Sequence, residues 1–141
     1  MNDLIITRGL PGAGKSHAIL TLMRERNLQH RDTVVCSADH FFMKDDEYVF
    51  NVTKLGQAHM ECQKKAFEAM STGMPTVIID NTNSRLWEYE FYVTMAACFD
   101  YQVEILMVGG LSYNHVREYA ARNIHGVPED TVLRMAYRWE D

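Results

Sequence analysis

The chain has 141 residues, of which 47% are hydrophobic and 11% aromatic, a composition typical of globular proteins that excludes a disordered chain. Its length predicts one domain spanning residues 1–141. The formal charge of −5 argues against broad non-specific binding to duplex DNA, because basic side chains supply most of that binding.

Targeting and redox signals favour a cytoplasmic protein. No run of about 18 apolar residues occurs, so we expect no membrane-spanning helix. The first predicted strand follows Met1 almost at once and leaves no room for a signal peptide. Cys36, Cys62 and Cys98 are an odd number of cysteines at wide spacings, and we expect them to be reduced thiols.

The first predicted elements are a strand, a glycine-rich loop and a helix. Residues 4–7 form an apolar run that predicts a buried strand, and residues 15–26 carry apolar positions at helical spacing. Between them lies Gly9-Leu10-Pro11-Gly12-Ala13-Gly14-Lys15-Ser16, which matches the Walker A pattern G-x-x-x-x-G-K-[ST]. The motif needs this order of elements, so we predict that the chain binds a nucleoside triphosphate.

The residue types of this loop account for phosphate binding. Glycines let backbone N–H groups point inward at phosphate oxygens, and the following helix adds its positive N-terminus. Lys15 places a charge on the β- and γ-phosphates, and the Ser16 hydroxyl is a ligand for Mg²⁺. We therefore predict ATP and Mg²⁺ as cofactors. The nucleotide-binding residues are expected to be Gly9, Pro11, Gly12, Ala13, Gly14, Lys15, Ser16 and His17.

Strands and helices alternate along the rest of the chain. Further strands are expected over residues 33–37, 76–79 and 101–108, and helices over 52–72, 85–99, 112–123 and from Pro128 onward. Strands that are apolar on both faces and alternate with helices predict a parallel sheet. We expect an α/β, three-layer P-loop NTPase fold. Its short parallel sheet should have strand order 2-3-1-4, counted along the chain, with helices on both faces.

Ligands of such sheets lie beyond the carboxyl ends of the strands, so the residues that follow each strand should face one cleft. Asp80 follows a run of β-branched residues, which is the pattern of a Walker B element. We expect its carboxylate to hold Mg²⁺ together with Ser16, directly or through water. The alternative is an aspartate that caps the following turn.

Three further side chains are candidates for phosphoryl-transfer chemistry. Asp39 follows the second strand and could accept the proton of an acceptor hydroxyl, although it could instead cap a helix. Arg117 and Arg122 lie on the helix after the fourth strand, and at least one could neutralise charge on the transferring group. The alternative for both arginines is an exposed position that serves solubility.

The acceptor is expected near the second and third strands. Arg85 follows the Asp80 turn and could hold an acceptor phosphate, and Asn83 lies in the same turn. Phe42 belongs to an aromatic segment that could stack on a base or another flat acceptor, or could anchor the segment to the core. We therefore expect acceptor contacts at Phe42, Asn83 and Arg85.

Together these segments resemble the phage-type 5′-hydroxyl polynucleotide kinases, which are small P-loop kinases related to zeta-toxin-like and gluconate-kinase-like enzymes. The resemblance covers nearly the whole chain. It runs through the Walker A loop, Ser37-Ala38-Asp39, Ile79-Asp80-Asn81-Thr82-Asn83, Arg122-Asn123 and Val127-Pro128. The stretches 48–83 and 122–128, with Trp87-Glu88, most resemble one branch, the kinase-like ATPase module of animal ubiquitin-ligase-binding proteins and its microbial and viral relatives.

This resemblance implies transfer of the γ-phosphate of ATP to a polynucleotide 5′-hydroxyl, with Asp39 as general base and Arg122 as a lid arginine. Two departures concern the acceptor. The phage enzymes carry an arginine three residues after the base, where this chain has Phe42. They also carry a second lid arginine, where this chain has the shortened segment Ile124-His125-Gly126.

Three functions remain open at this point. The first is a kinase that acts on the 5′ end of a single-stranded nucleic acid. The second is a kinase for a small hydroxylated substrate such as a nucleoside or a sugar acid, which the acidic charge and Phe42 favour. The third is an ATP-binding switch that recruits a partner. Asp39 argues against the switch, because a switch needs no acceptor base.

Overall fold

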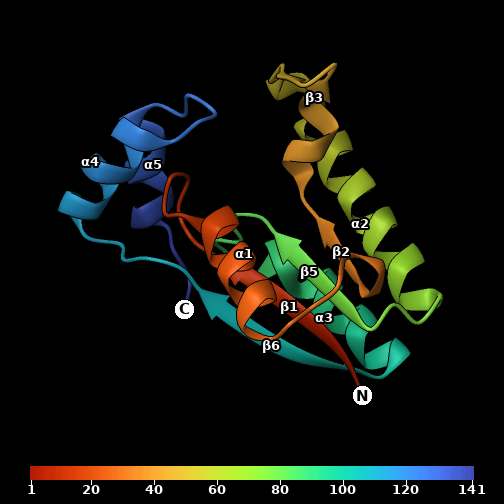
Figure 1. Cartoon of the computed structure of the whole chain (residues 1–141). Helices are drawn as coiled ribbons and strands as arrows, with labels where there is room; N and C mark the ends of the chain where they lie inside the picture. The colour runs from red at the N-terminus through yellow and green to blue at the C-terminus, as the bar shows by residue number, and fades with distance from the viewer.

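The computed structural model describes residues 1–141 and is built around four parallel strands (Figure 1). They are β1 (Asn2–Arg8), β2 (Thr33–Cys36), β5 (Thr76–Asp80) and β6 (Tyr101–Met107), in the order β2-β5-β1-β6. A separate antiparallel hairpin comprises β3 (Met43–Lys44) and β4 (Glu47–Tyr48). The predicted order 2-3-1-4 is confirmed. The labels differ only because the hairpin takes two strand numbers.

Five α-helices and three short 3₁₀ helices connect or follow the strands. The α-helices are α1 (Lys15–Glu25), α2 (Leu55–Ser71), α3 (Leu86–Phe99), α4 (Tyr113–Arg122) and α5 (Glu129–Tyr137). The 3₁₀ helices are η1 (His30–Asp32), η2 (Ala38–Phe42) and η3 (Val52–Lys54). None of the helices is long and apolar enough to cross a membrane.

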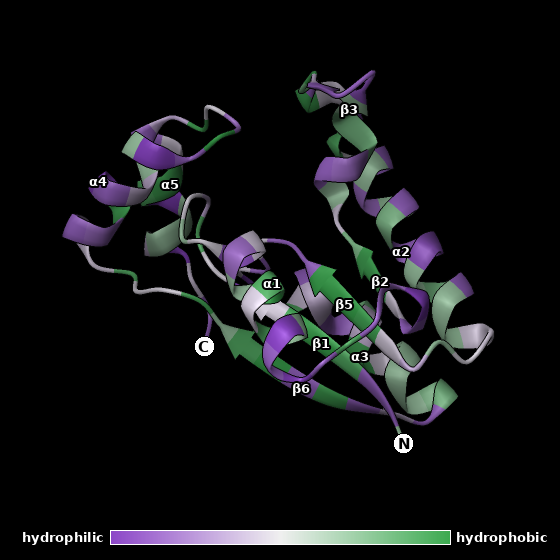
Figure 2. Ribbon diagram, viewed as in Figure 1, coloured by the Kyte–Doolittle hydropathy of each residue, from purple (hydrophilic) through white to green (hydrophobic).

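Helices cover both faces of the sheet, as predicted. Successive side chains of a strand point to opposite faces, so Leu4 and Ile6 of β1 pack with α2 and α3 while Ile5 packs with α1. Figure 2 shows β1 and β5 as mostly hydrophobic, in contrast to the mostly hydrophilic α4. Burial on both faces explains the continuous apolar runs of these two inner strands, whereas the edge strand β6 is largely exposed and alternates with polar residues.

Helices α4 and α5 lie apart from the sheet, over the loop that follows β1 (Figure 1). Leu10 and Ala13 of that loop pack with Val116 and Tyr119 of α4. A Cβ atom at Gly12 would lie 2.3 Å from the Tyr119 carbonyl oxygen, and the φ of Gly12 is +85°. Glycine is therefore required at residue 12 because α4 packs directly against the backbone of the loop.

The register of the sheet brings the predicted site segments together. Thr7 of β1 pairs with Asp80 of β5, so both strands end at one level. The amide of Gly9 then donates to the carbonyl of Thr82 at 3.1 Å. The Walker A loop and the turn after Asp80 are therefore neighbours at the carboxyl edge of the sheet.

Helix α3 begins without a side-chain cap. Its N-cap is Arg85, which makes no side-chain capping hydrogen bond. The preceding Ser84 hydroxyl donates to the Glu88 carboxylate at 2.7 Å, and the buried Asn83 side chain donates to the carbonyl of Thr7.

The C-terminal residues are held by a buried arginine that the sequence did not single out. Arg8, at the end of β1, is 6% exposed and lies between the rings of Tyr89 and Trp139, 4.8 Å from each centroid. Its guanidinium donates to the carbonyls of Asn83, Ser84 and Glu140. Arg8 therefore ties the C-terminus to the turn after β5, and its charge is stabilised by carbonyl dipoles and aromatic faces.

Candidate active site

The Walker A loop has the backbone that phosphate binding requires. Gly12 and Gly14 have φ values of +85° and +99°, and α1 begins directly after Gly14. The N-terminus of α1, with its unpaired N–H groups, therefore points into the loop. His17, in the first turn of α1, is exposed.

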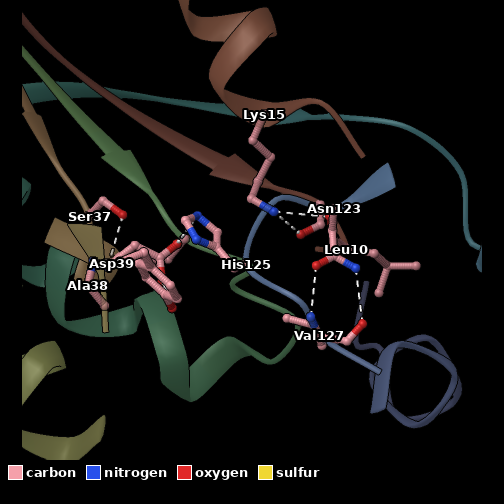
Figure 3. A network of polar contacts seen from close by, with 11 residues as sticks. Leu10, Lys15, Ser37, Ala38, Asp39, Asn123, His125 and Val127 are labelled. Atoms are coloured by element: carbon pink, nitrogen blue, oxygen red, sulfur yellow. Dashed lines mark hydrogen bonds and ion pairs between the residues drawn. The ribbon is translucent and has the colours of Figure 1, made fainter. Parts of the chain in front are cut away.

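Lys15 curls back over the loop from the start of α1 (Figure 3). Its Nζ donates to the carbonyls of Gly9 at 2.8 Å and Leu10 at 3.1 Å. Burial lowers the pKa of Lys15, while the nearby carboxylates of Asp80 and Asp39 raise it. The structure thus brings together the three charged residues that the sequence placed on different segments.

Asp80 lies beside Ser16, as the metal-site prediction requires. Burial raises the pKa of Asp80, and the charge of Lys15 and a hydrogen bond from Ser16 lower it. Mg²⁺ in phosphoryl-transfer sites is held by one or two protein oxygens together with substrate phosphates and water. Ser16 and Asp80 supply a donor set of that kind.

The backbone of Asp39 is fixed from two strand ends. The Asp39 amide donates to Ser37 Oγ at 3.2 Å, and the Ala38 amide donates to Asn81 Oδ1 at 2.9 Å. The capping residue of η2 is therefore Ser37. Asp39 does not act as the helix cap, which was its alternative role, and its carboxylate is near enough to Lys15 to raise the pKa of that residue.

Both carboxylate oxygens of Asp39 contact aromatic residues that the sequence did not single out as its partners. The Tyr48 hydroxyl donates to Oδ1 at 3.1 Å, and His125 Nε2 lies 3.5 Å from Oδ2. Burial and the Asp39 charge raise the pKa of Tyr48, so its hydroxyl stays protonated and donates. Tyr48 comes from the β3–β4 hairpin and His125 from the α4–α5 turn, so only the fold brings them to Asp39.

Of the two candidate arginines, Arg122 contacts the loop. Its Nε donates to the carbonyl of Gly12 at 2.7 Å, and its Nη1 donates to Glu118 at 3.0 Å. Arg117 instead pairs with Glu129 of α5 at 3.7 Å, and 65% of its side chain is exposed. Residues five apart on a helix point in different directions, and the packing of α4 orients Arg122 toward the loop.

The structure corrects the predicted acceptor contacts. Phe42 and Asn83 are each 2% exposed, so neither presents a surface to a substrate. Phe42 packs against three aromatic neighbours, and Asn83 Nδ2 donates to the carbonyl of Thr7 at 2.8 Å. Arg85 lies 3.9 Å from Glu140 at the C-terminus. The sequence predicted the segments in which Phe42 and Asn83 lie but not that packing buries both side chains.

A cavity of about 270 Å³ adjoins the metal-site residues Ser16 and Asp80. His40, the residue after the predicted base, lines it together with His30 and Thr33. Burial and the charge of Lys65 lower the pKa of His40. His40 was not singled out by its sequence position, because a lone histidine after an aspartate carries no motif.

Comparison with known proteins identifies relatives of the whole chain. A family model described as AAA domain, AAA_33, matches residues 4–140. NEDD4-binding protein 2 of Homo sapiens is 35% identical over 137 residues. The match covers 97% of the chain but only 8% of that human protein.

Solved structures with the same fold include a chain of an RNA repair complex and a gluconokinase. The Pnkp1/Rnl/Hen1 RNA repair complex contains a chain with TM-score 0.70 and 16% identity, matched over 97% of this chain and 43% of that one. A gluconokinase from Sinorhizobium meliloti has TM-score 0.62 and 13% identity, over 99% and 75% of the two chains. At these identities the likeness shows the fold alone.

The predicted resemblance is therefore confirmed at the level of the family. The family match covers nearly the whole chain, and the human relative is a NEDD4-binding protein by its name. The Walker A loop, the parallel sheet and the two helices over the loop agree with that assignment. The chain belongs to the AAA_33 family of AAA domains and has the fold of P-loop kinases.

Proposed function

We propose that the chain transfers the γ-phosphoryl group of ATP to a hydroxyl acceptor, with a polynucleotide 5′-hydroxyl as the favoured acceptor. The observation that carries the proposal is the position of the Asp39 carboxylate relative to Lys15. The carboxylate lies near Lys15, and hydrogen bonds from two strand ends fix the backbone of Asp39. Phosphoryl transfer needs one carboxylate that faces the acceptor hydroxyl and a cation on the phosphates.

The proposed reaction gives each residue one task. The acceptor oxygen forms a bond to the γ-phosphorus while its proton passes to Asp39. The bond from the γ-phosphorus to the bridging oxygen breaks, and ADP leaves with that electron pair. Lys15 and Arg122 offset the negative charge of the phosphates. Bound Mg²⁺ would neutralise further charge, and Ser16 and Asp80 are the residues that would hold it.

A polynucleotide acceptor is supported by the family resemblance and by the hairpin beside Asp39. Phe50 is 51% exposed and stacks on Tyr48 with a ring separation of 6.4 Å, so an aromatic face remains at the cleft although Phe42 is buried. Unstacked bases of single strands bind such faces.

The free, buried thiols of Cys36 and Cys62 support the expected cytoplasmic location, where thiols stay reduced.

A kinase for a small hydroxylated molecule is the second candidate. The cavity of about 270 Å³ beside Asp80 and His40 supports it, because small substrates are bound in concave sites. The acidic charge of the chain supports it as well.

The acceptor is identified by following labelled γ-phosphate from ATP. We expect label on single-stranded DNA or RNA with a free 5′-hydroxyl and none on the same strands already phosphorylated. We also expect a shallow dependence on salt, because the missing phosphate-binding arginine leaves few phosphate contacts. Label confined to nucleosides or sugar acids would replace the first candidate by the second. Binding of ATP without transfer to any acceptor would favour the switch.

Arg122→Ala is expected to lower turnover about tenfold while changing the KM for ATP less than threefold, because the arginine acts on charge that develops during transfer. Arg117→Ala is the matched control on the same helix and should change turnover less than twofold, since Arg117 pairs with Glu129. Steady-state kinetics of both variants check this. Equal losses in the two variants would contradict the role of Arg122.

A further inference from the structure

Hydrogen bonds from the side chain of Asn123, the first residue of the turn between α4 and α5, hold that turn together. Asn123 Nδ2 donates to the carbonyl of Val127 at 3.0 Å, and the Val127 amide donates to Asn123 Oδ1 at 2.8 Å (Figure 3). Asn123 Nδ2 also reaches the Ala120 carbonyl of α4 at 3.1 Å, and Gly126 has a φ of +68°. These bonds fix the three residues between Asn123 and Val127, and the turn carries His125 toward Asp39.

His125 sits firmly in this position. Its ring centroid lies 4.0 Å from that of Tyr48, and its side chain is 30% exposed. The Nδ1 atom is buried and has no hydrogen-bond partner, while Nε2 faces Asp39 Oδ2. A buried N–H without a partner is costly, so we place a proton on Nε2, the nitrogen that faces Asp39. The Nε2–H group then points at the carboxylate.

The two contacts of Asp39 differ in length, and the longer contact is the one that an incoming hydroxyl can replace more easily. Tyr48 is 3.1 Å from Oδ1, a normal hydrogen-bond distance, whereas His125 is 3.5 Å from Oδ2. An incoming hydroxyl therefore replaces His125 more readily than it replaces Tyr48. The Asp39 side chain is 49% exposed, so water also reaches it.

We infer that His125 is a positioning residue that occupies Asp39 Oδ2 until an acceptor hydroxyl replaces it, and that it thereby restrains the hydrolysis of ATP by water. The inference rests on the proposed role of Asp39 as base. In hydrolysis, a water oxygen bonds to the γ-phosphorus, its proton passes to Asp39 and ADP leaves. A bound acceptor has further contacts that offset the displacement of His125, and a single water molecule has none.

The test measures ATP hydrolysis without acceptor and phosphoryl transfer with the best acceptor of the panel. His125→Ala should raise acceptor-independent hydrolysis about three- to tenfold, which corresponds to the loss of one weak polar contact with the carboxylate. His125→Phe keeps a ring against Tyr48 without the N–H donor and should give the same rise. His125→Gln keeps an N–H donor, so its rate of ATP hydrolysis should be closer to that of the wild type than the rates of the other two variants.

The control in the same turn is Ile124→Ala, because Ile124 is 86% exposed and makes none of these contacts. It should leave both rates unchanged. A purely structural role of His125 would lower hydrolysis and transfer together and shift the thermal unfolding midpoint. Unchanged or reduced hydrolysis in both His125→Ala and His125→Phe would overturn the inference.

A double variant separates this inference from the proposed function. Adding Asp39→Asn to His125→Ala should abolish the extra hydrolysis, because the base that water uses is then absent. Extra hydrolysis that persists in the double variant would overturn the inference even if transfer by the wild type is confirmed. Absence of transfer by the wild type to every acceptor would count against the proposed function itself, while the hydrolysis rates of the His125 variants could still be compared.

Discussion

Asp39→Asn is expected to lower the rate of phosphoryl transfer about 100-fold or more while ATP affinity stays within a few-fold of the wild type. Asparagine has the size of aspartate and can still accept the hydrogen bond from Tyr48, so the hairpin should stay in place. It cannot take up the proton of an acceptor hydroxyl. The loss should therefore appear in kcat and leave the binding of ATP almost unchanged.

The measurement is single-turnover transfer of labelled phosphate, together with calorimetry of ATP binding. Asp46→Asn is the matched control, because Asp46 lies in the turn of the hairpin with a φ of +65°, a conformation that asparagine also adopts. It carries the same chemical change at an exposed position and should leave transfer unchanged. Undiminished transfer by Asp39→Asn would show that Asp39 serves only to hold Tyr48 and His125.

Lys15→Ala is expected to weaken ATP binding tenfold or more, about 1.4 kcal/mol at minimum. Turnover should fall further, by about 100-fold, because the ammonium group acts on phosphates that gain charge during transfer. Its two present bonds are to the loop carbonyls of Gly9 and Leu10, and both bonds are only partly buried. The fold should therefore survive the substitution.

Calorimetry with ATP and Mg²⁺ measures the affinity, and thermal unfolding without nucleotide checks the fold. Lys64→Ala, at an exposed position of α2, removes the same charge away from the loop and is the control. We expect it to bind ATP as the wild type does. If wild-type protein shows no binding of ATP in this experiment, the Walker A loop does not function as its sequence predicts.

Features that depend on neighbouring residues in the chain were predictable. The Walker A loop is one contiguous segment whose function requires glycines, a lysine and a hydroxyl at set spacings. The apolar runs of β1 and β5 showed that the sheet is buried on both faces. Asp80 could be placed beside Ser16 because parallel strands end at one edge of a sheet.

Features that depend on packing between distant segments were not predictable. Phe42 looked like a stacking residue, yet three aromatic neighbours bury it. The sequence could not choose between Arg117 and Arg122, because the choice depends on how α4 rotates against the loop. Arg8 follows a strand like many surface arginines, and only the approach of Tyr89 and Trp139 makes it a buried anchor.

By itself, the sequence determined the phosphate-binding loop and the segments that meet at the edge of the sheet, because local spacing and strand polarity specify them. The tertiary structure decided which side chains face the cleft and what they contact. Asp39 is the clearest case. Its position after β2 was evident, but its partners Tyr48 and His125 lie 9 and 86 residues further along the chain and reach it only through the packing of the hairpin and the α4–α5 turn.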